Sequence, residues 1–247
     1  GVAPFARAED GGNHGTRRVR IPLHPLRGGA EHLFRVLDPD GLRGPGGERY
    51  AWTPAEIVLA APVPRPGKIM HTSCNFTAHL SELTTWKEPE WQSHNWKDFH
   101  FEHPTGFLEA PSSVVASGAK VPVPHFTKQL DYEIEIAIII GKPAFRVSIA
   151  DAMDYVAGYT IFNDLSARDI QAREHSNKVI LLGKSFNGSC PFGPHLVTPD
   201  ELGDPHQLAM QLKVNGVVRQ DANTSQMHYK TAELVSWWSN TTLEPGD

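Results

Sequence analysis

The stretch Leu130-Asp131-Tyr132-Glu133-Ile134-Glu135-Ile136-Ala137-Ile138-Ile139-Ile140 decides how this chain is interpreted. It is rich in β-branched residues and stops at Gly141, which together predict a β-strand. Because side chains alternate along a strand, Glu133 and Glu135 share one face, and the opposite face carries Tyr132 and most of the isoleucines. The sequence therefore predicts two acidic side chains placed together on an otherwise apolar strand.

Two carboxylates side by side on such a strand repel each other and resist burial. A divalent cation between them would remove that cost, and ligation by carboxylates favours Mg²⁺, Mn²⁺ or Ca²⁺ over Zn²⁺. The alternative is an edge strand that keeps both acids in water. The strand by itself leaves both interpretations open.

A further acid follows the apolar segment 158–163. Asp164 stands at the predicted end of this strand, and a possible N-cap and helix start follow it. At that position Asp164 is suited to be a third metal ligand beside Glu133 and Glu135. The alternative is that Asp164 caps the helix and Arg168 forms a surface pair with Asp169.

Three more side chains are candidates for catalysis. His79 and Glu82 stand three residues apart on a predicted short helix, where the carboxylate can orient the imidazole as a general base for water. Lys184 lies between apolar residues and could stabilise an oxyanion. The alternative for His79 and Glu82 is an ordinary surface pair, and the alternative for Lys184 is an ordinary loop lysine. A rival histidine cluster around His100 and His103 lacks support from a predicted strand or helix.

Composition limits the remaining possibilities. The chain has 247 residues, 40% of them hydrophobic, and a net charge of −5. These values favour a globular protein and argue against a nucleic-acid binder, which needs a basic surface. No apolar run is long enough to span a membrane. Breaker-rich residues 1–66 predict a small, loosely patterned N-terminal region before residues 67–247, which hold the candidate catalytic residues. The absence of a signal peptide and the unpaired spacing of Cys74 and Cys190 predict a cytoplasmic protein with free thiols.

The order of the motifs resembles the fumarylacetoacetate hydrolase family, in its smaller three-carboxylate type. The matching segments are N-F-x-x-H-x-x-E at 75–82, D-Y-E-I-E-I-A-I-I-I-G-K at 131–142, the long segment 154–171, G-K-S-F at 183–186 and V-N-G-V-V-R-Q at 214–220. The resemblance runs from about Lys68 to Asp247. It implies an α+β, β-rich fold, a mixed β-roll with a small N-terminal domain, and a homodimer.

The resemblance also implies roles for individual residues. Glu133, Glu135 and Asp164 become ligands of Mg²⁺ or Mn²⁺, with Ca²⁺ as a further candidate. The dyad His79 and Glu82 activates water, and Lys184 holds an oxyanion. Arg168 and Gln171 fall where members of the family contact substrate or order the site. The spacer 83–104 corresponds to a lid, and the turn Pro245-Gly246-Asp247 leads into further strands in relatives.

Two positions depart from the family pattern. The eukaryotic fumarylacetoacetases carry another acidic ligand seven residues before the dyad histidine, and this chain has Thr72 there. Many members have lysine before the segment Pro111-Ser112-Ser113, where this chain has Glu109. The second departure replaces a positive charge on the substrate side of the site with a negative one.

The expected activity is metal-dependent hydrolysis of a carbon–carbon bond in a 1,3-diketo or 2-oxo acid, such as an acylpyruvate of aromatic catabolism. One alternative is a 2-oxo acid decarboxylase, tautomerase or isomerase on the same scaffold, which needs no activated water. A second alternative is a non-catalytic, metal-binding relative. The expected partner is a small oxo acid, with no nucleic acid and no membrane.

Overall fold

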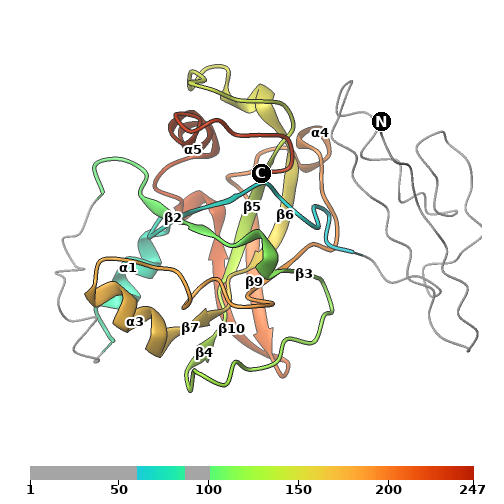
Figure 1. Cartoon of the computed structure of the whole chain (residues 1–247). Coiled ribbons are helices and arrows are strands. Elements are labelled where there is room, and N and C mark those ends of the chain that lie inside the picture. Colours follow the sequence, from blue (N-terminus) through green and yellow to red (C-terminus); the bar gives the residue numbers. More distant parts are fainter. Residues whose placement is uncertain (1–59, 87–100) are drawn as a thin grey trace, which may run out of the picture.

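The computed structural model describes residues 60–86 and 101–247 (Figure 1). The predicted N-terminal region 1–66 lies mostly outside these residues, and so does most of the predicted lid 83–104. Both remain predictions. None of the helices in the described part of the chain is long and apolar enough to cross a membrane.

A four-stranded mixed sheet forms the centre of the fold (Figure 1). Its order is β3 (Val114–Ala116), β8 (Cys190–Phe192), β6 (Val156–Asn163) and β5 (Ile134–Ile140). β3 and β8 run parallel, and the other two pairs are antiparallel. The predicted α+β, β-rich fold with mixed strands is confirmed.

Three two-stranded sheets and several short helices surround this sheet. The paired strands are β1 (Ile69–Thr72) with β2 (Gly106–Glu109), β4 (Leu130–Asp131) with β7 (Ser166–Ala167), and β9 (Ala209–Val214) with β10 (Val217–Asn223). The α-helices are α1 (Thr77–Leu83), α3 (Arg168–Ser176), α4 (Pro199–Leu202) and α5 (Thr231–Trp238). The 3₁₀ turns are η4 (Pro111–Ser113), η5 (Ala152–Tyr155) and η6 (Thr224–Gln226).

The predicted strand over 130–140 is present but interrupted at Tyr132 and Glu133. Two backbone N–H groups there donate to side chains instead of to the backbone of a neighbouring strand. The Glu133 N–H donates to Asn163 Oδ1 at 3.2 Å, and the Ile134 N–H donates to Gln220 Oε1 at 2.8 Å. The interruption places Glu133 between β4 and β5, at the start of the long strand.

Two apolar clusters lie around β5 and β6. One joins Ile140 and Tyr159 to Val235 of α5 and Leu243. The other joins Ile139 and Phe162 to Phe192 and Cys190 of β8. Burial of these side chains, at about 25 cal/mol per Å² of apolar surface, fixes β5 and β6 in place. The polar ends of the same two strands are thereby held close together.

The C-terminal turn, residues 245–247, contacts Lys68 and the end of β5. Asp247 forms an ion pair with Lys68, and its carbonyl accepts from the Ile140 N–H at 3.0 Å. Gly246 has φ of 92°, a conformation that glycine adopts without strain. The turn predicted at residues 245–247 is present, and the strands expected beyond it remain a prediction.

Candidate active site

A buried ion cluster lies where β5 begins and β6 ends. The ammonium Nζ of Lys184 donates to Glu133 Oε2 and to Asp164 Oδ2. Asp164 directly follows β6, and its N–H donates to the Glu133 carbonyl at 2.9 Å. This backbone bond brings the two acids to the same point, as expected from their positions at strand ends.

The charges of this cluster depend on one another. Burial opposes ionisation of Glu133, but Lys184 and Arg168 outweigh it and hold the pKa of Glu133 well below its usual range. Burial raises the pKa of Asp164 well above its usual range, although Lys184 and His71 oppose the shift. Burial would lower the pKa of Lys184, but Asp164 and Glu133 raise it. Lys184 is therefore a permanent cation at neutral pH, suited to electrostatic stabilisation and not to proton transfer.

Arg168 connects the cluster to the first turn of α3. Its guanidinium donates to Asp131 Oδ2 at 2.8 Å, to Glu133 Oε1 at 2.7 Å and to Gln171 Oε1 at 3.0 Å. The same group lies 4.9 Å from the centre of the Trp86 ring. The surface pair of Arg168 with Asp169 that the sequence left open does not form, because Asp169 accepts from Thr127 instead. Arg168 thus orders Glu133 from the side opposite Lys184.

The dyad lies on α1, which packs against α3 through Leu83 and Ala172 (Figure 1). His79 Nδ1 is 3.4 Å from Glu82 Oε2, and His79 Nε2 is 4.0 Å from Glu133 Oε1. The hydrogen bond from His79 lowers the pKa of Glu82, so this carboxylate is an acceptor. With Glu82 as the acceptor, Nδ1 carries the shared hydrogen, and the other ring nitrogen, Nε2, faces the ion cluster through Glu133.

Glu135 follows on β5 and lines the same cavity, whose volume is about 460 Å³. Glu133, His79, Glu82 and His71 also contribute to its wall. Burial and the neighbouring Glu133 raise the pKa of Glu135, against the opposing effects of His71 and Lys184. No ion pair to Glu135 occurs among the residues that the structure describes. Glu135 is therefore an acid in the cavity wall without a compensating cation of its own.

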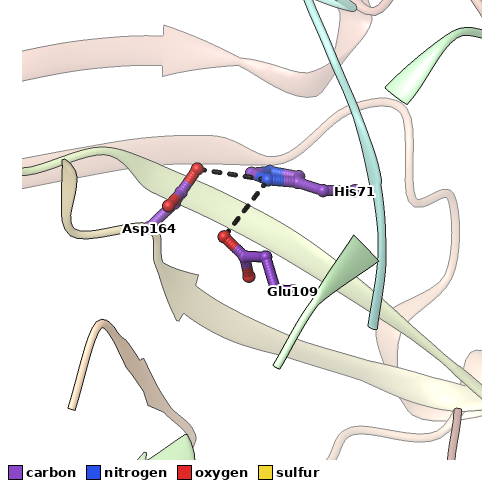
Figure 2. Close-up of side chains that lie close together, drawn as sticks. All are labelled: His71, Glu109 and Asp164. Carbon is purple, nitrogen blue, oxygen red and sulfur yellow. Dashed lines mark ion pairs between the residues drawn. The ribbon is translucent and has the colours of Figure 1, made fainter. Parts of the chain in front are cut away.

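Two residues of this region were not expected from the motifs, His71 and Glu109 (Figure 2). His71 Nδ1 lies 3.1 Å from Asp164 Oδ2 and 3.6 Å from Glu109 Oε1. Burial lowers the pKa of His71, but Asp164 and Glu109 outweigh it and raise it to about 10. The departure from lysine at Glu109 was visible in the sequence. His71 lies in no motif, and only the pairing of β1 with β2 reveals it.

The carboxylates present fit a divalent cation. The ammonium of Lys184 already places a positive charge where oxygens of Glu133 and Asp164 converge. Asp164 Oδ1 and Glu109 Oε1 are buried and accept no hydrogen bond from the described residues. Buried oxygens of this kind are costly unless a donor or a cation satisfies them. The set of oxygen donors is the kind that hard dications prefer.

Both cysteines are free, as the sequence predicted. Burial and nearby Glu133 raise the pKa of Cys74 to about 11, and burial with nearby Glu109 raises that of Cys190 further. Because the thiolate is the reactive form, the native protein should react with iodoacetamide at pH 8 about 100-fold more slowly than the urea-unfolded chain. Mass spectrometry of timed samples measures this. Equal labelling rates in the two states would contradict the environment described for the thiols.

Comparison with known proteins agrees with this geometry. Residues 68–247 match the family described as Fumarylacetoacetate (FAA) hydrolase C-terminal. The chain is 39% identical over 194 residues to a mitochondrial oxaloacetate tautomerase of Homo sapiens, covering 78% of this chain and 57% of that protein. It is 37% identical over 201 residues to an oxaloacetate tautomerase of Bacillus subtilis, covering 80% and 62%.

A solved structure agrees with the fold. The 5-carboxymethyl-2-hydroxymuconate delta-isomerase from Mycobacterium smegmatis superposes with a TM-score of 0.65 at 30% identity, covering 79% of this chain and 70% of that one. The chain spans less than two thirds of the length of the two tautomerases. The names of these three proteins describe two oxaloacetate tautomerases and one isomerase.

Proposed function

This chain belongs to the fumarylacetoacetate hydrolase family, and from that membership we propose that it is an enzyme that tautomerises a 2-oxo dicarboxylic acid such as oxaloacetate. The proposal takes up the alternative drawn from the sequence and replaces carbon–carbon hydrolysis as the main expectation. Its support is the identity of 37–39% to oxaloacetate tautomerases. That support does not extend to the hydrolase activity.

One observation about the site carries the proposal. Nε2 of His79 lies 4.0 Å from Oε1 of Glu133, and both residues line a cavity of about 460 Å³. The same Glu133 carboxylate pairs with the cations Lys184 and Arg168, which place positive charge directly behind it. Tautomerisation needs only a base that takes a proton from carbon and a positive environment for the oxygen that gains charge. The reaction needs no water in the cavity and no leaving group.

Each residue has a definite task in this proposal. His79 Nε2 takes the proton from C3 of the oxo acid, the C–H electron pair forms the C2–C3 double bond, and the π electrons of the C2 carbonyl move to its oxygen. Glu82 holds the imidazole in the required tautomer. Lys184 holds the oxygen while it is negative, and the oxygen then takes the proton that His79 carries, which gives the enol and returns His79 to its starting state. Arg168 keeps Glu133 in position from the other side.

We propose that Glu133, Glu135 and Asp164 hold the divalent cation on which members of this family generally depend. A cation bound there would supply Lewis-acid polarisation of the C2 carbonyl. The carboxylates would then share their negative charge between this ion and Lys184. A homodimer and a cytoplasmic location remain predictions from the sequence.

The test follows the decay of the oxaloacetate enol by its ultraviolet absorbance, in chelator-treated protein and after addition of Mg²⁺ or Mn²⁺. The metal-loaded protein should accelerate relaxation to the keto form by at least about 100-fold over buffer with the same ion, the usual size of general acid–base catalysis. His125→Gln, which changes an exposed histidine away from the cavity, should match the wild type. NMR spectroscopy of the same samples should show only the keto and enol forms.

Other products would decide for the other activities. Oxalate with acetate would indicate hydrolysis between C2 and C3, and pyruvate would indicate decarboxylation. Either product, formed faster than in buffer and without enol relaxation, would overturn the tautomerase proposal. An acylpyruvate given to the same protein tests hydrolysis independently. Cleavage of its carbon–carbon bond with uptake of water would release pyruvate and a second carboxylic acid.

A further inference from the structure

A second set of potential ligands converges on Asp164, which Lys184 also contacts. It consists of His71 of β1, Glu109 of β2 and Asp164 itself (Figure 2). One ligand atom from each lies within 4.8 Å of the others. This spacing is compatible with three ligand atoms around a single ion, given metal–ligand bonds of about 2.0–2.2 Å.

The pairing of β1 with β2 explains why these side chains meet. His71 stands opposite Phe107, and Glu109 stands opposite Ile69. Opposed residues of an antiparallel pair project to the same face, so His71 and Glu109 are diagonal neighbours on one face. That face is directed at the end of β6, where Asp164 follows. Three separate segments thus contribute one ligand each.

The ligand atoms are buried and unsatisfied. Glu109 is 2% exposed and Asp164 is fully buried. Nδ1 of His71, Oε1 of Glu109 and Oδ1 of Asp164 form no hydrogen bond with any described residue, although Nδ1 lies 3.1 Å from Asp164 Oδ2. Each such buried group destabilises the protein when it is left unmatched. One cation among them would satisfy all three residues.

The composition of the set selects the kind of ion. The three carboxylates proposed above offer oxygen alone, whereas this set adds an imidazole nitrogen. An imidazole ligand binds Zn²⁺ and Fe²⁺ better than Mn²⁺. It binds all three of these transition-metal dications better than Mg²⁺. Asp164 is paired with Lys184, whereas the only ion-pair partner of Glu109 among the described residues is His71, so no lysine or arginine supplies charge to Glu109.

We propose that His71, Glu109 and Asp164 form a metal-binding site of mixed nitrogen and oxygen ligands that takes a transition-metal dication in preference to Mg²⁺. Asp164 is shared with the carboxylate site, and Glu133 and Glu135 belong only to that site. The proposal does not depend on which reaction the enzyme catalyses. It assigns to the unusual Glu109 a ligand role in place of the positive charge that many relatives carry at this position.

Pulsed EPR of the full chain loaded with one equivalent of Mn²⁺ tests the nitrogen ligand. The wild type should show hyperfine coupling to a directly bound ¹⁴N, and His71→Gln should abolish it. His79→Gln and His125→Gln should retain the coupling, since neither residue belongs to the proposed set. A wild type without nitrogen coupling, or a coupling that survives in His71→Gln, would overturn the site.

Calorimetric titration with Mn²⁺ and Mg²⁺ gives a second readout. His71→Gln should weaken Mn²⁺ binding at least about tenfold while changing Mg²⁺ binding much less. If circular dichroism shows that His71→Gln does not fold, Glu109→Gln takes its place with the same expected loss for Mn²⁺. An unchanged ratio of the two affinities in the folded variant refutes the selectivity. Failure of the tautomerase assay would leave both measurements unaffected.

Discussion

Replacing Glu133 with alanine should lower the free energy of unfolding by about 3–5 kcal/mol, because it leaves two buried cations without their shared partner. Lys184 and Arg168 both donate to this carboxylate, and Glu133 itself is buried. Urea denaturation at pH 7, followed by circular dichroism, measures the loss. The same variant should also lose oxaloacetate tautomerisation.

Glu135→Ala is the matched control, since it changes the same residue type two positions along the same strand. Glu135 has no ion pair within the described residues and a raised pKa, so its removal should change stability by less than about 1 kcal/mol. Its removal should still weaken binding of the divalent ion. Equal stability of the two variants would contradict the central place given to Glu133.

The stabilisation by Glu133 should depend on pH with a definite sign. Its pKa is lowered in the folded state, so its contribution is present above the pKa of an unfolded glutamate, about 4.3. The contribution decreases as the pH falls below that value, where the unfolded state takes up the proton first. The difference in stability between wild type and Glu133→Ala should therefore become smaller from pH 5 towards about pH 3. A difference that grows in acid would contradict this assignment.

Replacing Lys184 with methionine should lower the rate of tautomerisation by about 100- to 1000-fold, the cost of removing one preorganised group that stabilises an oxyanion. Methionine keeps an unbranched side chain in the buried site and removes the charge alone. Steady-state rates with saturating Mg²⁺ or Mn²⁺ measure the effect. Metal affinity should be retained or improved, because the ammonium no longer competes for Glu133 and Asp164.

Lys120→Met provides the comparison, because Lys120 is an exposed lysine and is not among the cations paired with these carboxylates in the described residues. It should leave rates and metal affinity unchanged. A Lys184→Met enzyme that retains at least a third of wild-type turnover with bound metal would refute the electrostatic role. A loss of metal binding in step with turnover would show that Lys184 instead organises the ligands.

Much of this site could be expected from local sequence patterns. The alternation along residues 130–140 indicated Glu133, and the end of an apolar strand indicated Asp164. The fold brings these two acids together. The spacing of His79 and Glu82 correctly predicted a helix with both side chains on one face. These features depend on one or two neighbouring elements, where the periods of strands and helices determine direction.

The features that the sequence did not reveal depend on contacts between distant segments. The interruption at Tyr132 and Glu133 arises because side chains of Asn163 and Gln220 satisfy the backbone there. The contact of Arg168 with Trp86 joins two segments about 80 positions apart. His71 approaches Asp164 only after β1, β2 and β6 have assembled. No local period encodes such contacts.

The diagonal pairing of His71 with Glu109 has a consequence for how this chain could have diverged from relatives with lysine at the second position. A lysine beside the His71 imidazolium would place two positive charges together on one buried face. A glutamate diagonal to a neutral residue at position 71 would be a buried anion with less positive charge nearby to compensate it. Whichever of the two positions is substituted first, the intermediate protein should therefore be less stable, and substitution of the other position should restore the stability. The two positions should therefore be inherited together, with the order of substitution constrained by epistasis.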